Sequence, residues 1–219
     1  MLGTLKQTAE LVEVFRTRGK ELTYKKGEFI IRPGETPTGV FYIYQGLVKA
    51  YDITKYGEEN LLIIRKEHEL FPLIWAITGQ ERSVIYESLA AKTIVWRIDR
   101  DEFTSHMQSH PDALAPLLDM TIEMYRLHSE RILNLEYRSV RERIISFLLT
   151  MNQRFGTRTT YGSLIAVPLR HQDIASSINS SRETVSRELA ALERKGLLSS
   201  DQSCITLRDV KALRFQLSE

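Results

Sequence analysis

The sequence predicts an α+β protein in which three regions follow one another: short antiparallel strands, one long helix, and a small helical module with a strand hairpin. Two observations support this order. Eight of the eleven glycines lie within residues 1–79, among short runs of aromatic and β-branched residues, and the next is Gly156. An apolar repeat with three- and four-residue steps begins after Pro111, where that glycine-rich part has ended.

Composition excludes several classes of protein. The chain of 219 residues is 42% hydrophobic and 26% charged, which is typical of a folded globular protein and not of a disordered or collagen-like one. The lone cysteine, Cys204, cannot form an intramolecular disulfide, an iron–sulfur cluster or a multi-cysteine zinc site. We therefore expect no metal, no evident cofactor and no iron–sulfur cluster. No apolar run reaches the ~18 residues of a membrane helix, and no signal peptide is evident, so we expect a cytoplasmic protein without membrane contact.

Charge is distributed unevenly along the chain. Residues 1–138 carry 18 Lys and Arg against 20 Asp and Glu, whereas residues 139–219 carry 12 against 8. The basic excess at the C-terminal end is a weak indication of nucleic-acid binding there.

The first region, residues 1–110, reads as an antiparallel β-roll, that is, a jelly-roll-like double-stranded β-helix. A helix is expected over residues 5–18, where Gly19 stops it. Short strands between turn residues are then expected over 29–31, 40–44, 47–53, 61–64, 84–89 and 93–98. Regular short strands with frequent turns favour a closed or sandwiched unit.

Residues 111–138 predict one amphipathic helix of roughly 27 residues, about 40 Å long. Proline suits its first turn. Its apolar face comprises Leu114, Leu118, Ile122, Tyr125, Ile132 and Leu135. From periodicity alone two interpretations stay open. The helix either packs on its own β unit or forms a parallel coiled-coil seam between two subunits.

Residues 139–219 predict a winged helix-turn-helix. One helix follows Ser139, a strand covers 164–168, and two short helices cover 172–178 and 182–195, the second closed by Gly196. A hairpin joins 197–198 to 204–207. Two close helices followed by a hairpin are typical of this motif.

The turn between the two short helices has the residues that a helix-turn-helix requires. Asn179 suits the left-handed conformation that the turn requires. Ser180 and Glu183 fit a capping box at the start of the second helix. Val185 and two later leucines form its buried stripe, so another face is left for solvent.

That solvent face carries Arg182, Glu183, Ser186 and Arg187. Arginine can bond guanine O6 and N7, and glutamate can accept from cytosine N4, each good pair giving roughly 1–3 kcal/mol of discrimination. The alternative interpretation is a solvated helix with an i,i+4 Glu183–Arg187 ion pair, worth about 0.2–0.5 kcal/mol.

The sequence resembles the Crp/Fnr superfamily of transcription regulators over about residues 20–215. The second helix carries the family signature in residues 181–187, SRETVSR. Upstream residues match the turns of its cyclic-nucleotide-binding β-roll: Lys26-Gly27-Glu28, Pro33-Gly34, Gly46 and Gly57.

The resemblance implies a homodimer through residues 111–138, which favours the coiled-coil interpretation, with double-stranded DNA and RNA polymerase as partners. It implies that Arg182, Glu183 and Arg187 read the bases of a GTGA-type half-site and that Thr184 touches a phosphate. Further candidate DNA contacts are Ser181, Ser186 and His171. Two-fold symmetry then requires a palindromic operator with half-site centres about 34–36 Å apart.

The effector pocket departs from the family pattern. Members that bind cyclic AMP carry Phe-Gly-Glu and, at a fixed spacing after the glutamate, Arg-Ser or Arg-Thr. This chain has Arg82-Ser83, but at that spacing before it stands Leu73, within Phe71-Pro72-Leu73. Leucine has no acceptor for the ribose hydroxyl, and an unpaired buried hydroxyl costs on the order of 1–3 kcal/mol. His128 stands where adenine-contacting members have threonine. We therefore expect that cyclic AMP is not used in the usual way.

Two interpretations of Arg82 stay open: a phosphate ligand kept from the family pocket, or an ion-paired or surface arginine beside Glu81. Another small molecule is a candidate effector near Trp75, Tyr125 and His128, and a protein without an effector is equally consistent with the sequence. The residues of the candidate pocket are Arg82, Ser83, Leu73, Trp75, Tyr125 and His128.

An enzyme is not expected, and no catalytic residue is proposed. The sequence has no glycine-rich phosphate loop, zinc-binding histidine pair or nucleophile elbow. The alternative function is a sensor subunit for a cyclic nucleotide or another small ligand that acts without direct DNA binding. The arginines and glutamate of the reading face argue against it.

Overall fold

The computed structural model describes residues 5–201 and 203–217. The chain forms two compact units, Met1–Tyr125 and Arg126–Glu219, so the boundary between them lies within the long helix. The predicted division into residues 1–110, 111–138 and 139–219 gives that helix a segment of its own and stays a prediction. In the described part of the chain no helix is long and apolar enough to span a membrane.

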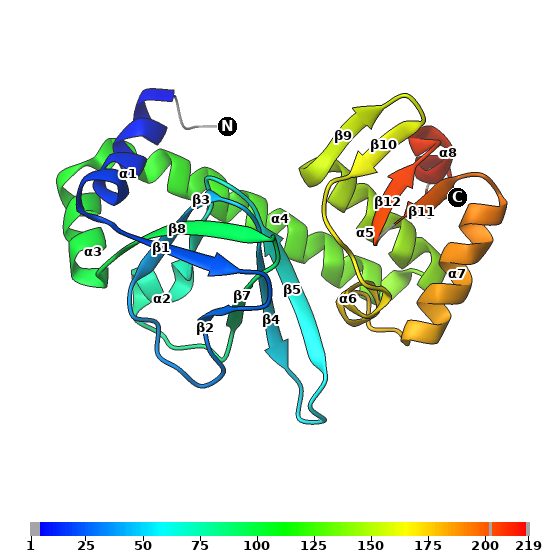
Figure 1. Ribbon diagram of the computed structural model, residues 1–219, viewed down its shortest axis with the longest axis horizontal. Coiled ribbons are helices and arrows are strands. Elements are labelled where there is room, and N and C mark those ends of the chain that lie inside the picture. The colour runs from blue at the N-terminus through cyan, green and yellow to red at the C-terminus, as the bar shows by residue number, and fades with distance from the viewer. Residues whose placement is uncertain (1–4, 202, 218–219) are drawn as a thin grey trace. The chain divides into compact units, whose positions relative to one another are not determined.

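The first unit contains two four-stranded antiparallel sheets, ordered β1-β8-β3-β6 and β2-β7-β4-β5 (Figure 1). All six predicted strands are present. The eight strands are β1 (Lys20–Lys25), β2 (Phe29–Ile31), β3 (Val40–Gln45), β4 (Val48–Ile53), β5 (Glu59–Arg65), β6 (Leu70–Phe71), β7 (Ile85–Ser88) and β8 (Lys92–Ile98). Strands β1 and β6 were not predicted: β1 is mostly polar, and β6 has only two residues.

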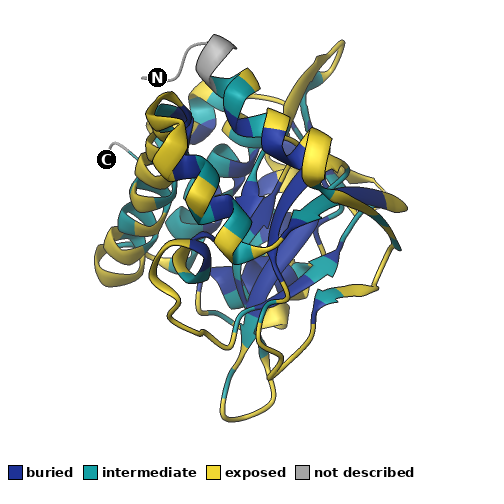
Figure 2. Cartoon of the chain, turned by 90° about the vertical axis from the view of Figure 1, so that its left-hand side faces the viewer, coloured by how far each residue is buried: buried dark blue, intermediate teal, exposed yellow. Residues whose placement is uncertain are grey.

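The two sheets share a core, which confirms the predicted β-roll. Side chains alternate along β3, so that Phe41 and Ile43 face the other sheet while Val40 and Tyr42 face outward. Phe41 and Ile43 pack in one cluster with Val48 and Ala50 of β4. Buried residues accordingly concentrate in the strands of this unit (Figure 2).

Helices cover the outer face of the first sheet. They are α1 (Leu5–Arg18), α2 (Leu73–Thr78), α3 (Arg100–Ser109), the 3-10 turn η1 (Pro111–Ala113) and the start of α4 (Leu114–Tyr137). Phe15 of α1 packs there against Tyr42 of β3 and against Phe103 of α3. Helix α1 ends at Arg18, just before Gly19, as predicted. A Cβ at position 19 would lie 2.1 Å from the Phe15 carbonyl oxygen, so the backbone there requires glycine.

Helix α4 differs slightly from its prediction. The helix expected from Pro111 begins with the single turn η1, and the regular α-helix has 24 residues. Leu117 is buried, whereas Leu118 and Ile122 on the predicted apolar face are 49% and 52% exposed. The predicted stripe therefore exists on α4 but is not covered within the described chain.

The second unit is a winged helix-turn-helix, as predicted. Its elements are α5 (Val140–Phe155), β9 (Gly156–Thr159), β10 (Gly162–Ile165), α6 (His171–Ser177), α7 (Arg182–Arg194), β11 (Leu198–Asp201), β12 (Cys204–Leu207) and α8 (Val210–Phe215). The strands form one antiparallel sheet, β11-β12-β10-β9 (Figure 1). The strand expected over 164–168 lies two residues earlier, and β9 and α8 were not predicted.

Candidate nucleic-acid interface

Helices α6 and α7 pack against each other through small and apolar side chains. Ala175, Ile178 and Val185 are buried, as expected for the corner between them. Asn179 has φ +52°, the left-handed conformation that the sequence predicts for the turn. Gly196 has φ +70° just after α7, which confirms it as the residue that closes the helix.

The capping residue of α7 is Ser181, not Ser180 as predicted. Ser181 Oγ accepts a hydrogen bond from the Thr184 amide at 3.1 Å, and its backbone is extended. The Ser180 amide instead donates to the Ala175 carbonyl oxygen at 3.0 Å, so Ser180 still belongs to the turn. Because the cap is one residue later, Arg182 and Glu183 occupy the first two positions of α7.

The predicted reading face is exposed at the N-terminal end of α7. The side chains of Arg182 and Glu183 are 68% and 79% exposed, and their closest charged atoms are 3.9 Å apart. Ser186 and Arg187 are exposed on the next turn. The Glu183–Arg187 pair of the alternative interpretation does not form among the described residues. Arg187 is thus available to a partner from outside the chain.

The remaining predicted contacts are Thr184 of α7 and His171 of α6. Thr184 is half-buried, and its hydroxyl lies 3.0 Å from Ser181 Oγ. His171 is the first residue of α6 and is partly exposed. Directly before it, Arg170 makes two side-chain bonds to the buried Asp173 carboxylate, at 3.0 and 2.8 Å. This bidentate pair fixes the start of α6.

Comparisons with known proteins agree with this geometry. The model of the cyclic nucleotide-binding domain family matches residues 21–110, and that of the Crp-like helix-turn-helix domain matches residues 142–215. The global nitrogen regulator of Synechocystis sp. is 29% identical over 223 residues, which cover 98% of this chain and 99% of that protein. The chain belongs to the Crp/Fnr family of transcription regulators.

Two further comparisons support the assignment. The transcriptional activator protein anr of Pseudomonas aeruginosa is 26% identical over 208 residues, covering 94% of this chain and 82% of that protein. The solved structure of FixK2 from Bradyrhizobium japonicum superimposes with a TM-score of 0.77 at 25% identity, covering 90% of this chain and 96% of the other. By their names, the two curated relatives are a global nitrogen regulator and a transcriptional activator, which are regulators and not enzymes.

The candidate effector residues of this Crp/Fnr regulator lie in different settings. Leu73 begins α2 and is buried in the core, so its side chain supplies packing. The Arg100 guanidinium lies over the Trp75 ring, and its Cζ is 5.8 Å from the centre of that ring. Tyr125 and His128 are exposed on α4. That these residues form one ligand pocket together with Arg82 and Ser83 stays a prediction.

Arg82 and Ser83 are exposed just before β7. The neighbouring Glu81 accepts a hydrogen bond from the Thr36 hydroxyl at 2.8 Å, and no Arg82–Glu81 ion pair forms in the described chain, so Arg82 is a surface arginine there. Burial raises the pKa of the Tyr86 hydroxyl, and the guanidinium groups of Arg65 and Arg82 oppose that shift. The charge of Arg82 therefore acts on a buried tyrosine of the β-roll.

Sequence reasoning missed several charged residues of this regulator. Lys49 and Arg65 are buried in the β-roll, where they pair with Glu59 and Glu69. Arg141 of α5 pairs with Glu188 of α7, 47 residues away. Alternation along β4 and β5 indicates which residues share a face, but it does not indicate which charged residues pair. No local sequence pattern predicts a pair as far apart in the chain as Arg141 and Glu188.

Proposed function

We propose that this Crp/Fnr regulator binds a palindromic operator as a homodimer and reads each half-site with the first turns of α7. The exposed face of Arg182, Glu183, Ser186 and Arg187 carries this proposal. The resemblance to the family implies a GTGA-type half-site, and the side-chain chemistry is consistent with it, because arginine bonds guanine and glutamate accepts from cytosine. RNA polymerase as a further partner and a cytoplasmic location follow from the same proposal.

The dimer would form along α4. Leu114, Leu118, Ile122, Tyr125 and Ile132 follow one another at helical spacing and are 47%, 49%, 52%, 75% and 63% exposed. Exposed apolar residues in such a row are typical of a helix that packs against a second copy. A dimer spaces its two reading helices by about one helical turn of DNA, which is why the operator would be palindromic.

The effector of this regulator would not be cyclic AMP bound in the usual manner. Leu73 is committed to the core, so its position offers no acceptor to a ribose hydroxyl. Relatives differ in this respect: one from Mycobacterium tuberculosis, 25% identical, is named a cAMP-activated regulator, and another is named a global nitrogen regulator. Family membership is therefore consistent with a different small molecule or with none.

Selection of bound duplexes from a random pool tests the proposal. We expect a palindromic consensus, and an affinity that falls steeply as salt is raised. Selection in the presence of cyclic AMP is expected to yield the same consensus with unchanged affinity. A protein that enriches no duplex at low salt would overturn the proposed DNA binding. Titration calorimetry showing micromolar cyclic AMP binding at one site per subunit would overturn the effector part alone.

A further inference from the structure

The first turn of α5 directs two arginines toward the helix-turn-helix. Arg141 and Arg143 lie two residues apart, directly after the helix begins at Val140. Ser139 caps this turn, and Glu142 completes a capping box with it. Ile144 and Ile145 then bury the helix in the second unit. The two arginines therefore extend from a helical turn whose backbone is fixed by the cap and by the buried isoleucines.

Arg143 holds the turn between α6 and α7. Its Nη1 donates to the Ile178 carbonyl oxygen at 2.8 Å and approaches that of Asn179 at 3.5 Å. Carbonyl groups at a helix end lack partners within the helix, and a cation there is favourable. Ile178 caps α6, and Asn179 is the left-handed residue, so this guanidinium binds the two carbonyls at which the chain changes direction.

Arg141 holds α7 itself. Its Nε donates to Glu188 Oε2 at 2.7 Å, within the range of a charge-assisted hydrogen bond. The Glu188 side chain is only 18% exposed, so the pair is partly shielded from solvent. Glu188 follows Arg187 directly. The pair ties the middle of the reading helix to α5 and neutralises a carboxylate that would otherwise repel DNA phosphates.

Helix α5 is also connected to the end of α4. Asn134 Nδ2 donates to Ser146 Oγ of α5 at 2.8 Å. The last turns of α4, the first half of α5, the turn and α7 are thus linked by side-chain bonds within the second unit. A reading helix needs such support, because binding groups that are held only loosely lose specificity.

We propose that Arg143 and Arg141 are positioning residues for base reading, acting through the α6–α7 turn and through Glu188. This inference rests on the proposed function, because it assumes that α7 reads bases. Neither arginine needs to touch a base. Each restricts the orientations of α7, so that Arg182, Glu183 and Arg187 meet the correct base edges together.

Arg143→Met tests the turn contact, because methionine keeps most of the side-chain stem and loses the guanidinium. We expect the ratio of operator to random-duplex affinity to fall about 10-fold, the effect of losing one charge-assisted hydrogen bond. Arg143→Lys should recover part of the ratio, since it keeps a donor and the charge. Arg158→Ala is the matched control: it removes one positive charge from an exposed site on β9 and should leave the ratio unchanged.

Arg141→Ala and the exchange Arg141→Glu with Glu188→Arg test the second contact. The single variant should lower the specificity ratio, and the exchange should restore it, because the ion pair re-forms with the same net charge. If Arg141 instead contacted a phosphate, the exchange would fail, and affinity for operator and random duplex would fall alike, with the salt slope smaller by about 1. That result would overturn the positioning role of Arg141.

Thermal melting of each full-length variant separates folding from reading, with binding measured well below the melting transition. A ratio that falls at unchanged folded fraction supports the inference. If the wild type selects an operator and both single variants keep its ratio, the inference alone is overturned. If the wild type selects no operator, the proposed function is overturned and the inference falls with it.

Discussion

Arg187 lies one turn into α7 with an exposed side chain and no bond to Glu183. We predict that Arg187→Ala relaxes the preference at one base of each half-site, by roughly 1–3 kcal/mol per half-site. The physical reason is the loss of a bidentate donor to one guanine. Quantitative sequencing of duplexes bound from a random pool measures the change position by position.

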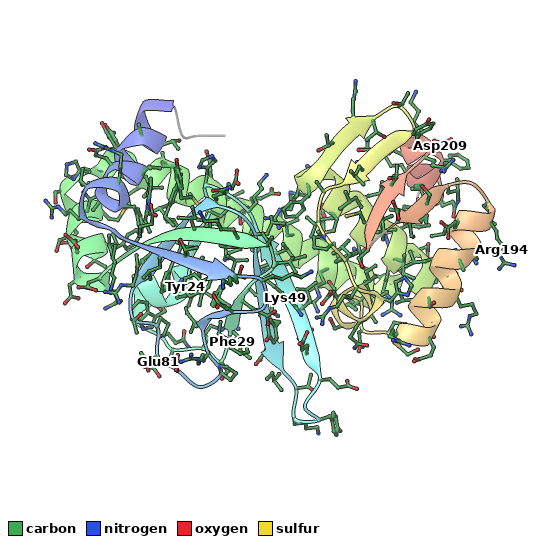
Figure 3. The ribbon with its side chains drawn as sticks, viewed as in Figure 1. Tyr24, Phe29, Lys49, Glu81, Arg194 and Asp209 are labelled. Carbon is green, nitrogen blue, oxygen red and sulfur yellow. The ribbon has the colours of Figure 1, made fainter. Side chains whose placement is uncertain are left out.

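Arg194→Ala is the control for this prediction. Arg194 is exposed at the far end of the same helix, away from the reading turns (Figure 3). It removes the same charge and should leave the consensus intact. Uniform weakening by Arg187→Ala at every base, with a smaller salt slope, would instead assign Arg187 to a phosphate.

Two single residues in the turn before α7 show what a local sequence pattern can and cannot predict. Asn179 was predicted to be left-handed, and it is, because few side chains tolerate that conformation and asparagine is one of them. The cap was misplaced by one residue, because Ser180 and Ser181 both satisfy the preference for a capping hydroxyl. The Ser180 amide is bonded to Ala175, and only the folded turn specifies that bond.

At the scale of elements, the exposed row on α4 leads to a second prediction. Ile122→Asp should convert the dimer to monomer, because it places a charge at the centre of the row that the second copy would cover. Since Ile122 is already 52% exposed, stability of the folded subunit should change little. Sedimentation equilibrium measures the mass, and titration with a palindromic duplex should show weaker binding.

Tyr137→Asp provides the comparison on the same helix. Tyr137 is 74% exposed and lies outside the row, so its variant should stay dimeric. If Ile122→Asp keeps the dimer mass, α4 does not form the interface and the exposed row needs another explanation.

Elements with strong periodicity were predictable, and those with polar or very short sequences were not. Strands β3 and β8 were predicted because aromatic and β-branched residues dominate them. Helix α3 carries only two buried side chains, Phe103 and Met107, among polar residues, so its sequence shows little amphipathic pattern. Packing against α1 and the first sheet stabilises α3, and a local reading cannot detect such packing.

For the whole molecule, the order of a β-roll, a long helix and a winged helix-turn-helix followed from glycine placement, the apolar repeat and the signature in α7. The candidate site was predictable only in part. Its reading face was predictable, because exposed Arg182 and Arg187 lie on one short helix. The supports in α5 were not, since the Arg141–Glu188 and Arg143–Ile178 contacts join residues 47 and 35 positions apart.

The stability of the whole molecule should also depend on pH through His106 of α3. His106 Nε2 lies 3.2 Å from the Glu10 carbonyl oxygen, and its ring stacks on His110 with centres 4.1 Å apart. Burial lowers the pKa of His106 below its ordinary value of 6.5; the contact with Glu10 opposes that shift, and the charges of His110 and Arg18 add to it. The unfolded chain therefore takes up a proton near pH 6.5 that the folded chain does not.

Because the unfolded state binds more protons in that window, this contribution to the free energy of unfolding is present above about pH 6.5 and is lost as pH falls toward the lower folded-state pKa. We predict that His106→Gln, which keeps a polar group near Glu10, loses less stability than the wild type between pH 7.5 and 5.5. Denaturant titrations at several pH values give the slope of the free energy of unfolding against pH for His106→Gln and for the wild type. Equal slopes for His106→Gln and the wild type would show that protonation of this ring is not linked to unfolding.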